Sequence, residues 1–167
     1  MLWTDQPPDF HRKSIEDLLS GLSFTDACAI ASGGNQRPVV IAPRRAMHGI
    51  RSHLSERSVE MGGLLVGNVH DLDPSGSQFV VSIEDYARCD EFDGTGVSLR
   101  METTVWELAR LKAPEGSFVI GWYHSHPNLG AFFSATDRRT QRAFFAQPYC
   151  IGPVSYTHLT LPTILRV

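Results

Sequence analysis

The sequence predicts an α/β fold in which a mixed β-sheet is flanked by helices. The first observation behind this class is that β-rich apolar runs alternate with helical patterns along the chain, as expected for strands and helices packed in layers. The second is a composition of 42% hydrophobic and 20% charged residues, which is that of an ordinary globular domain. The third is length, since 167 residues are enough for one domain with a buried core.

The individual elements are predicted from the spacing of apolar residues and from the residues that end each segment. Met47, Ile50 and Leu54 follow the i, i+3, i+7 spacing of one helix face. The helix that begins near Thr103 is expected to stop before Pro114. In chain order, the predicted elements are a helix at 14–22, a strand at 38–42, a helix at 45–57, strands at 61–66, 78–83 and 97–101, a helix at 103–112, a strand at 117–124, a helix at 134–145 and a strand that begins at 149.

The strand at 117–124 is nearly continuous in apolar residues, which is typical of a central strand covered on both faces. It runs directly into the sequence HSHP at 124–127. Residues i and i+2 of a strand point to the same face, so His124 and His126 are predicted to direct both imidazoles to one point. Pro127 cannot donate to a strand ladder and is expected to end the strand there.

A carboxylate is expected beside these two histidines, because Asp137 lies in the first turn of the helix at 134–145. Two imidazoles and one carboxylate leave the fourth position of a tetrahedral zinc ion open for water, which is the arrangement of a catalytic zinc site. A single histidine on a strand is usually structural, but this pair followed by an aspartate favours a metal site. Ser134 and Asp137 also fit a helix capping box, and the two roles are compatible.

A hydrolase built on such a metal needs a general base near the bound water. Several glutamates are available, and spacing alone does not select one of them. The candidates are Glu56, Glu60, Glu84, Glu102 and Glu107.

Two motifs together resemble the JAMM (MPN-type, JAB-domain) metalloprotease family. The sequence EMGGLLVG at 60–67 fits the pattern E-x-[GC]-G-x-L-x-G. The histidine that starts the second motif lies 64 residues after Glu60, and the residues from 124 to 137 fit H-x-H-P-x(6)-S-x(2)-D at every position. The resemblance covers about 39–151, and it implies a fold similar to the cytidine-deaminase superfamily.

The resemblance also implies roles for particular residues and a class of reaction. His124, His126 and Asp137 would bind one catalytic Zn²⁺ ion with its water, Glu60 would activate that water, and Ser134 would hydrogen-bond the tetrahedral intermediate. The implied activity is that of a metallopeptidase that cleaves a peptide or isopeptide bond at the C-terminus of a ubiquitin-like or sulfur-carrier protein. The alternative is a non-catalytic scaffold of the same fold, but the complete set of motif residues argues against it.

Composition and motifs exclude several other classes. A net charge of −3 and a pI near 6.1 give no electrostatic basis for binding nucleic acid or an anionic membrane. No apolar run approaches the roughly 20 residues of a membrane span. The three widely spaced cysteines suggest buried thiols in a reducing compartment, so a cytoplasmic location is expected. A nucleobase deaminase would need a C-x-x-C motif, and a metallo-β-lactamase-like site would need H-x-H-x-D-H; neither occurs.

The predicted division of the chain has three parts. Residues 1–37 are expected to be an N-terminal extension, and 38–152 the JAB/MPN metalloprotease domain. The stretch PVSYTHLTLPTILRV at 153–167 does not resemble the family's continuation and looks like translated adapter sequence. A non-native tail of this kind would leave the domain truncated at its C-terminus and would contribute no packing that the fold depends on. The alternative is a divergent terminal strand around 158–161.

Overall fold

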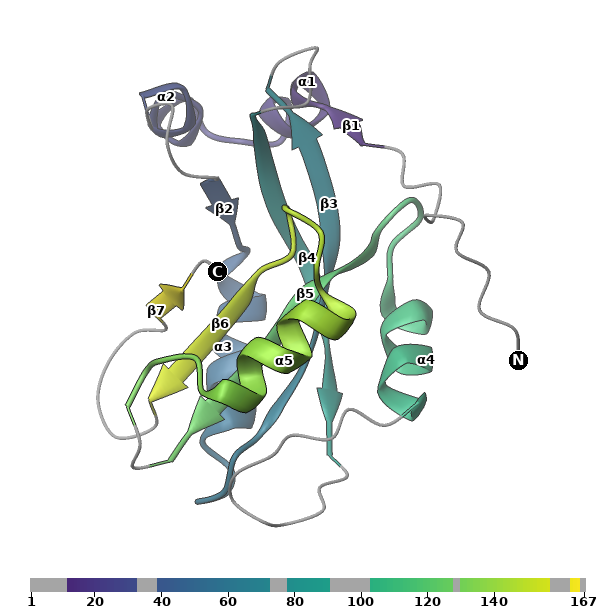
Figure 1. Cartoon of the computed structure of the whole chain (residues 1–167). Helices are drawn as coiled ribbons and strands as arrows, with labels where there is room; N and C mark the ends of the chain where they lie inside the picture. Colours follow the sequence, from purple (N-terminus) through teal and green to yellow (C-terminus); the bar gives the residue numbers. More distant parts are fainter. Residues whose placement is uncertain are drawn as a thin grey trace.

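The computed structural model describes residues 12–32, 39–72, 78–90, 103–127, 130–156 and 163–165. The predicted fold class is confirmed, because the strands form a mixed sheet with helices packed against it (Figure 1). In chain order the elements are β1 (Lys13–Ser14), α1 (Ile15–Leu19), α2 (Phe24–Ser32), β2 (Val39–Ile41), α3 (Arg44–Leu54), β3 (Gly62–Asp71), β4 (Phe79–Cys89), α4 (Thr103–Lys112), β5 (Phe118–His126), α5 (Ala135–Phe144), β6 (Gly152–Tyr156) and β7 (Thr163–Leu165).

Among the described residues the strands form one seven-stranded sheet in the order β2-β4-β3-β5-β6-β7, with β1 paired to the far end of β3. β3 pairs antiparallel with β4 on one side and with β5 on the other. β2 runs parallel to β4, and β6 runs parallel to β5. The strand predicted to be central, β5, therefore lies between β3 and β6.

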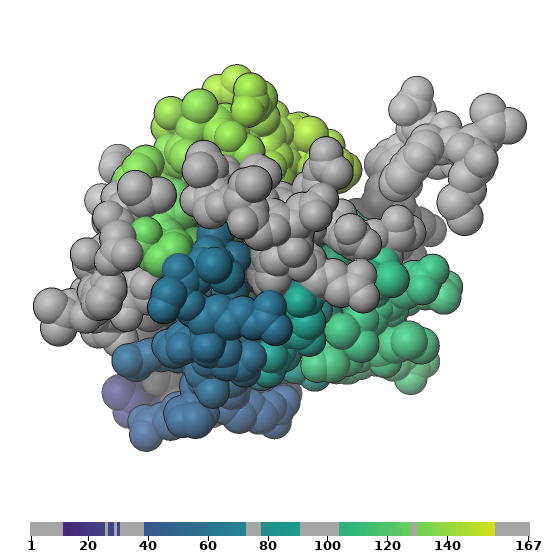
Figure 2. All heavy atoms as spheres, turned by 90° about the horizontal axis from the view of Figure 1, so that it is seen from below, coloured from purple at the N-terminus to yellow at the C-terminus, as the bar shows by residue number. Residues whose placement is uncertain are grey.

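Helices cover both faces of the sheet, and each face has its own apolar cluster. On one face, Ala46, Ile50 and Leu54 of α3 pack in a cluster that also contains Leu65 and Tyr123. On the other face, α4 and the segments that flank α5 pack against Leu64 and Val66 of β3 and Trp122 of β5. The blue atoms of α3 and the yellow-green atoms of α5 accordingly lie on opposite sides of the molecule in Figure 2.

A buried polar contact ties α3 to β5. The hydroxyl of Tyr123 and Nδ1 of His53 share a hydrogen bond of 2.9 Å, and neither side chain is accessible to solvent. Burial raises the pKa of the Tyr123 hydroxyl and lowers the pKa of His53. The uncharged forms of both groups are therefore favoured, and the contact acts as a neutral hydrogen bond in the core.

The predicted end of β3 near Gly67 is wrong, because the strand continues to Asp71. Its pairing with β4 shifts register between Val66 and Gly67, so the glycine marks a bulge rather than a strand end. A Cβ at position 67 would lie 1.9 Å from the carbonyl oxygen of Ser82. Gly121 in β5 has a φ of 151°, a conformation that other residues rarely adopt, at the place where pairing with β3 is irregular.

Other predicted boundaries differ by a few residues. The helix at 103–112 matches α4, whereas α3 ends at Leu54 rather than at 57. β1 and α2 were not predicted, since both are short or weakly amphipathic. The strands predicted at 97–101 and, alternatively, at 158–161 fall outside the described residues. No helix in the described part of the chain is long and apolar enough to cross a membrane.

The stretch 153–167 is packed in part: 153–156 belong to β6, and Thr163–Leu165 form β7, which pairs with β6. Whether the fold depends on this packing stays a prediction. Residues 152–156 form β6, which pairs in parallel with the histidine-bearing end of β5. Val154 lies opposite His124 and is fully buried. This strand therefore supports the end of β5, and whether the stretch is native stays a prediction.

Candidate metal centre

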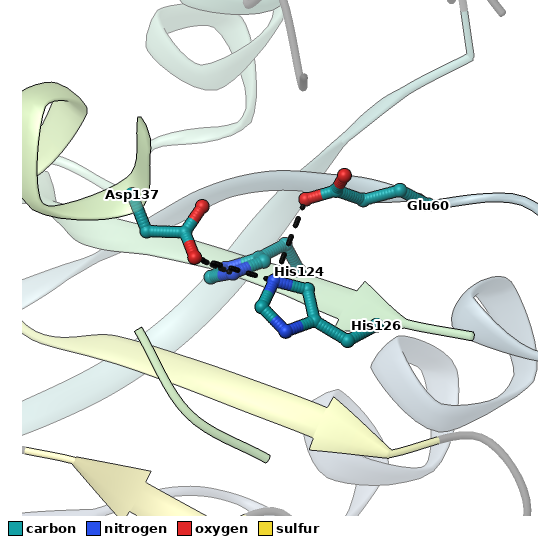
Figure 3. A group of neighbouring side chains, drawn as sticks. All are labelled: Glu60, His124, His126 and Asp137. Atoms are coloured by element: carbon teal, nitrogen blue, oxygen red, sulfur yellow. Dashed lines mark ion pairs between the residues drawn. The ribbon is translucent and has the colours of Figure 1, made fainter. Parts of the chain in front are cut away.

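The candidate site lies at the end of β5. Two histidines on the same face of this strand direct their Nε2 atoms toward Asp137. His124 and His126 are both buried, and their ring centroids are 4.8 Å apart. Figure 3 shows their imidazoles together with the carboxylates of Asp137 and Glu60. The strand gives way to a turn at Pro127, as predicted from the missing backbone donor.

The first turn of α5 holds Asp137 in place. Ser134 is the N-cap residue: its Oγ accepts a hydrogen bond from the backbone N–H of Asp137, at 3.1 Å. The backbone N–H of Ser134 donates in return to Asp137 Oδ2, at 2.6 Å. The predicted capping box is thus confirmed, and it fixes the carboxylate with one oxygen facing the histidines.

Glu60 reaches the site from the residue pair before β3. Gly62 lies opposite His124 in the antiparallel pairing of β3 and β5. Beyond that pair, Ser125 is bonded to Met61 in both directions: the Ser125 N–H donates to the Met61 carbonyl at 2.8 Å, and Ser125 Oγ accepts from the Met61 N–H at 3.1 Å. These two bonds place Glu60, the next residue back along the chain, beside His126.

The spacing of the polar atoms suits a metal ion. His124 Nε2 and His126 Nε2 lie 3.5 and 3.2 Å from Asp137 Oδ2. Ligand atoms around a tetrahedral zinc ion, with bonds of about 2.0–2.2 Å, lie roughly 3.3–3.6 Å apart. Glu60 Oε1 is 3.7 Å from His126 Nε2, and one ligand atom from each of the four residues lies within 4.8 Å of the others. Both imidazole nitrogens thus lie close to metal-ligand separations from Asp137 Oδ2.

Burial and mutual contacts set the charges of these groups. Burial lowers the pKa of His124, whereas the hydrogen bond to Asp137 raises the pKa of His126. Burial opposes ionisation of Asp137, but contacts with both histidines hold the pKa of its carboxyl below the usual range. Burial raises the pKa of Glu60. A neutral His124 and an ionised Asp137 are the protonation states that a metal ligand needs.

The structure brings together four of the five predicted site residues, namely Glu60, His124, His126 and Asp137, and it bonds Ser134 to Asp137. The other glutamates considered as bases lie elsewhere or outside the described residues. Glu56 pairs with Arg88, Glu84 accepts from Asn68, Glu107 is exposed on α4, and Glu102 is not described.

Sequence reasoning missed the contribution of Ser125. This residue is fully buried between the two histidines, and it bonds the segment that carries Glu60. The sequence does show a small polar residue whose side chain must lie on the face opposite the two histidines. Its bonding partner, Met61, could not be inferred without the register of β3 against β5.

The fold and the site together define an α/β protein with a candidate metal centre. The centre consists of two histidines, an aspartate and a glutamate, all buried at the end of the central strands. The model of one family, described as prokaryotic homologs of the JAB domain, matches residues 43–160 of this chain. The chain belongs to this family, and the resemblance seen in the two motifs is confirmed.

Two curated relatives extend the comparison. COP9 signalosome complex subunit 5 of Eremothecium gossypii is 34% identical over 95 residues, which make up 54% of this chain and 21% of that protein. Ubiquitin carboxyl-terminal hydrolase RPN11 of Saccharomyces cerevisiae is 30% identical over 90 residues, 52% of this chain and 27% of that protein. The chain therefore matches less than a third of the length of either relative.

A solved structure supports the fold. Protein DSY2949 from Desulfitobacterium hafniense matches with a TM-score of 0.54 at 21% identity, over 75% of this chain and 81% of that one. At this level of identity the likeness concerns the fold alone.

Proposed function

We propose that this chain is a zinc-dependent metallopeptidase that cleaves a peptide or isopeptide bond at the C-terminus of a ubiquitin-like or sulfur-carrier protein. The observation that carries the proposal is the convergence of two imidazole Nε2 atoms on one oxygen of Asp137, with the separate carboxylate of Glu60 beside them. The name of one relative, a ubiquitin carboxyl-terminal hydrolase, supports the class of substrate. The cytoplasm is the location we propose for this activity.

In this proposal His124, His126 and Asp137 hold the zinc ion. When bound, zinc supplies a Lewis acid that polarises a carbonyl group and lowers the pKa of a water molecule to about 7. The protein contributes ligands whose positions are fixed before the metal arrives, because Asp137 is held by the capping box and both histidines lie on one strand. His126 must give up any proton on Nε2 when it becomes a ligand, so zinc binding is expected to weaken at low pH.

Glu60 is the general base of the proposed reaction. It is not needed to complete a set of three ligands, and its carboxylate lies beside the ligand cluster at 3.7 Å from His126. Burial raises its pKa, which moves a carboxylate toward the range where it exchanges protons efficiently near neutral pH. Glu60 would accept a proton from the attacking water and pass it to the leaving nitrogen.

Ser134 would stabilise the oxyanion that forms on the scissile carbonyl. Its Oγ already accepts a hydrogen bond from the backbone N–H of Asp137, and a hydroxyl that accepts one bond still has its own hydrogen to donate. The capping role and the proposed donor role therefore use different atoms of the same hydroxyl. A donor of this kind contributes about 10²- to 10³-fold in kcat in other hydrolases.

The test uses the full chain, purified and analysed for zinc content. It is incubated with a ubiquitin-like protein whose C-terminal Gly-Gly is joined to a reporter, alone, with a chelator, and with a chelator followed by excess zinc. We expect stoichiometric zinc, cleavage after Gly-Gly, loss of cleavage with the chelator and its return with zinc.

Two matched controls sharpen this experiment. A fusion with Ala-Ala in place of Gly-Gly tests the substrate, and the His126→Ala protein tests the site. Stoichiometric zinc without cleavage of any ubiquitin-like fusion would overturn the catalytic proposal and favour the non-catalytic scaffold. Cleavage by the zinc-free His126→Ala protein would overturn the assignment of the site.

A further inference from the structure

His124 is held by aromatic rings rather than by a hydrogen bond to its outer nitrogen. Trp122 lies two residues earlier on the same face of β5, and its ring stacks on the His124 imidazole with centroids 4.2 Å apart and planes 4° from parallel. Phe133 meets the same imidazole edge-on, at 5.8 Å and 78°. His124 Nδ1 is buried and has no hydrogen-bond partner within the described part of the chain.

This arrangement differs from the usual way in which a protein orients a metal-binding histidine. The ring nitrogen that does not bind the metal normally donates to a carboxylate or carbonyl, which fixes the orientation of the ring. For His124 the described residues offer no such acceptor. The parallel indole instead opposes rotation of the imidazole, which would swing Nε2 away from Asp137 Oδ2.

The indole is itself fixed, and by the helix that carries Asp137. Trp122 Nε1 donates to Gln141 Oε1 at 2.7 Å. Gln141 Nε2 donates in turn to the carbonyl of Phe145 at 2.9 Å. Asp137 and Gln141 are four residues apart on α5 and therefore share one face of that helix. Both side chains are buried, so α5 holds one proposed ligand directly and reaches the other through Trp122.

The space around this contact is filled. A Cβ on Gly152 of β6 would lie 2.5 Å from Phe133 Cζ, 3.1 Å from Gln141 Oε1 and 3.3 Å from Trp122 Nε1. The indole cannot shift toward β6, and Phe145 stacks on it in parallel at 6.1 Å and 11°. Trp122 is 1% exposed, so its position is determined by packing and by one hydrogen bond.

We propose that Trp122 is a positioning residue that orients His124 for metal binding, and that Gln141 sets the position of Trp122. The inference rests on the proposed role of His124 as a zinc ligand. It adds that α5 couples the orientations of His124 and Asp137. Loss of the indole should therefore weaken metal binding although no ligand is removed.

The experiment measures zinc dissociation constants by competition with a chromophoric chelator, and the visible spectrum of the cobalt-substituted protein, for the full chain. The variants are Trp122→Leu, Trp122→Phe and Gln141→Met. Removal of a residue that orients a ligand costs about 10- to 100-fold in metal affinity, and we expect a loss of this size for Trp122→Leu. Gln141→Met keeps the indole beside His124 and Trp122→Phe puts a phenyl ring there, but both lose the hydrogen bond between Trp122 and Gln141. Both variants should lose less affinity than Trp122→Leu and should shift the cobalt bands.

Trp106→Leu is the matched control. Trp106 of α4 stacks on Phe145 at 5.7 Å and 13°, so it belongs to the same series of rings but does not contact His124 in any described pair. The same Trp-to-Leu change there should lower stability and leave the zinc affinity and the cobalt spectrum as in the unmodified protein. An equal loss of affinity in Trp106→Leu would overturn the proposal, because the effect would then reflect general stability.

The outcomes separate this inference from the proposed function. If the unmodified protein binds no zinc, both fail. If it binds zinc and folded Trp122→Leu binds equally well, only the role of Trp122 fails. If Trp122→Leu does not fold, unchanged zinc affinity and cobalt spectra in both Gln141→Met and Trp122→Phe overturn the role. In the metal-free protein, NMR of the His124 ring protons should show an upfield ring-current shift that Trp122→Phe reduces.

Discussion

Replacement of Glu60 by glutamine tests whether this residue moves a proton or binds the metal. The amide has nearly the size of the carboxylate and can occupy the same buried position, 8% exposed beside His126, but it cannot accept a proton at neutral pH. His124, His126 and Asp137 are left intact, so zinc should remain stoichiometric. General bases contribute about 10²- to 10⁴-fold to the rate, and we expect kcat to fall by at least the lower figure.

Glu56 provides the control. It carries the same charge four residues earlier, but its side chain is 40% exposed and its carboxylate pairs with Arg88 at 2.6 Å. An exposed ion pair contributes about 0.2–1 kcal/mol to stability, and Glu56→Gln should leave kcat and zinc unchanged. Rates are measured with the Gly-Gly fusion, and zinc by elemental analysis of the same samples. Full activity in Glu60→Gln would show that the base lies elsewhere, and loss of zinc would show that Glu60 is a ligand.

The remaining predictions concern the ligands, the cap, the rim of the site and the last strands. His124→Ala should lose zinc and activity together, and zinc that stays stoichiometric would refute its role. Ser134→Ala should lose about 1 kcal/mol of unfolding free energy with the cap and about 10²- to 10³-fold in kcat; if only stability falls, the residue is a cap alone. Phe132 is 46% exposed and meets His126 edge-on at 5.3 Å. We expect its exposed ring to contact the substrate. An aromatic contact of this kind contributes about 0.5–1.5 kcal/mol, so Phe132→Ala should raise KM by roughly 2- to 10-fold, and an unchanged KM would exclude the contact. Deletion of 153–167 removes the buried valine of β6, which contributes about 1.5–3 kcal/mol. The melting temperature should fall by roughly 3–12 °C and by less on deletion of 157–167, whereas equal effects would show that β6 adds no stability.

Local patterns predicted those elements whose ends are marked by residues near them in sequence. α4 was predicted with its observed bounds because Pro114 follows it closely, and the start of α5 was predicted because Ser134 and Asp137 form a capping box. β3 was predicted too short, since a glycine at position 67 usually indicates a strand end. Its continuation depends on a long pairing with β4 and on a bulge, and both are tertiary features that local sequence does not encode.

The same distinction applies to the candidate site. His124 and His126 could be paired from their spacing on one strand, and Asp137 from its place in the following helix. Glu60 could not be chosen from spacing among five glutamates, because its proximity to His126 is decided by how β3 aligns with β5. The family motif selected it, and the structure places its carboxylate 3.7 Å from His126.

The alignment of these two strands is therefore what assembles the candidate metal centre from separate segments. A slip of one residue between β3 and β5 would exchange the faces to which their side chains point and would carry Glu60 away from His126. Ser125 opposes such a slip at the place where it matters most, because its backbone and its hydroxyl both bond Met61. The residue between the two histidines thus connects the proposed base to the proposed ligands, although its side chain lies on the opposite face of the strand from theirs. Side chains alternate between the two faces along β5, so neighbouring residues have different roles. Trp122, His124 and His126 supply the indole and the proposed ligands on one face, and Ser125 holds the segment that carries Glu60.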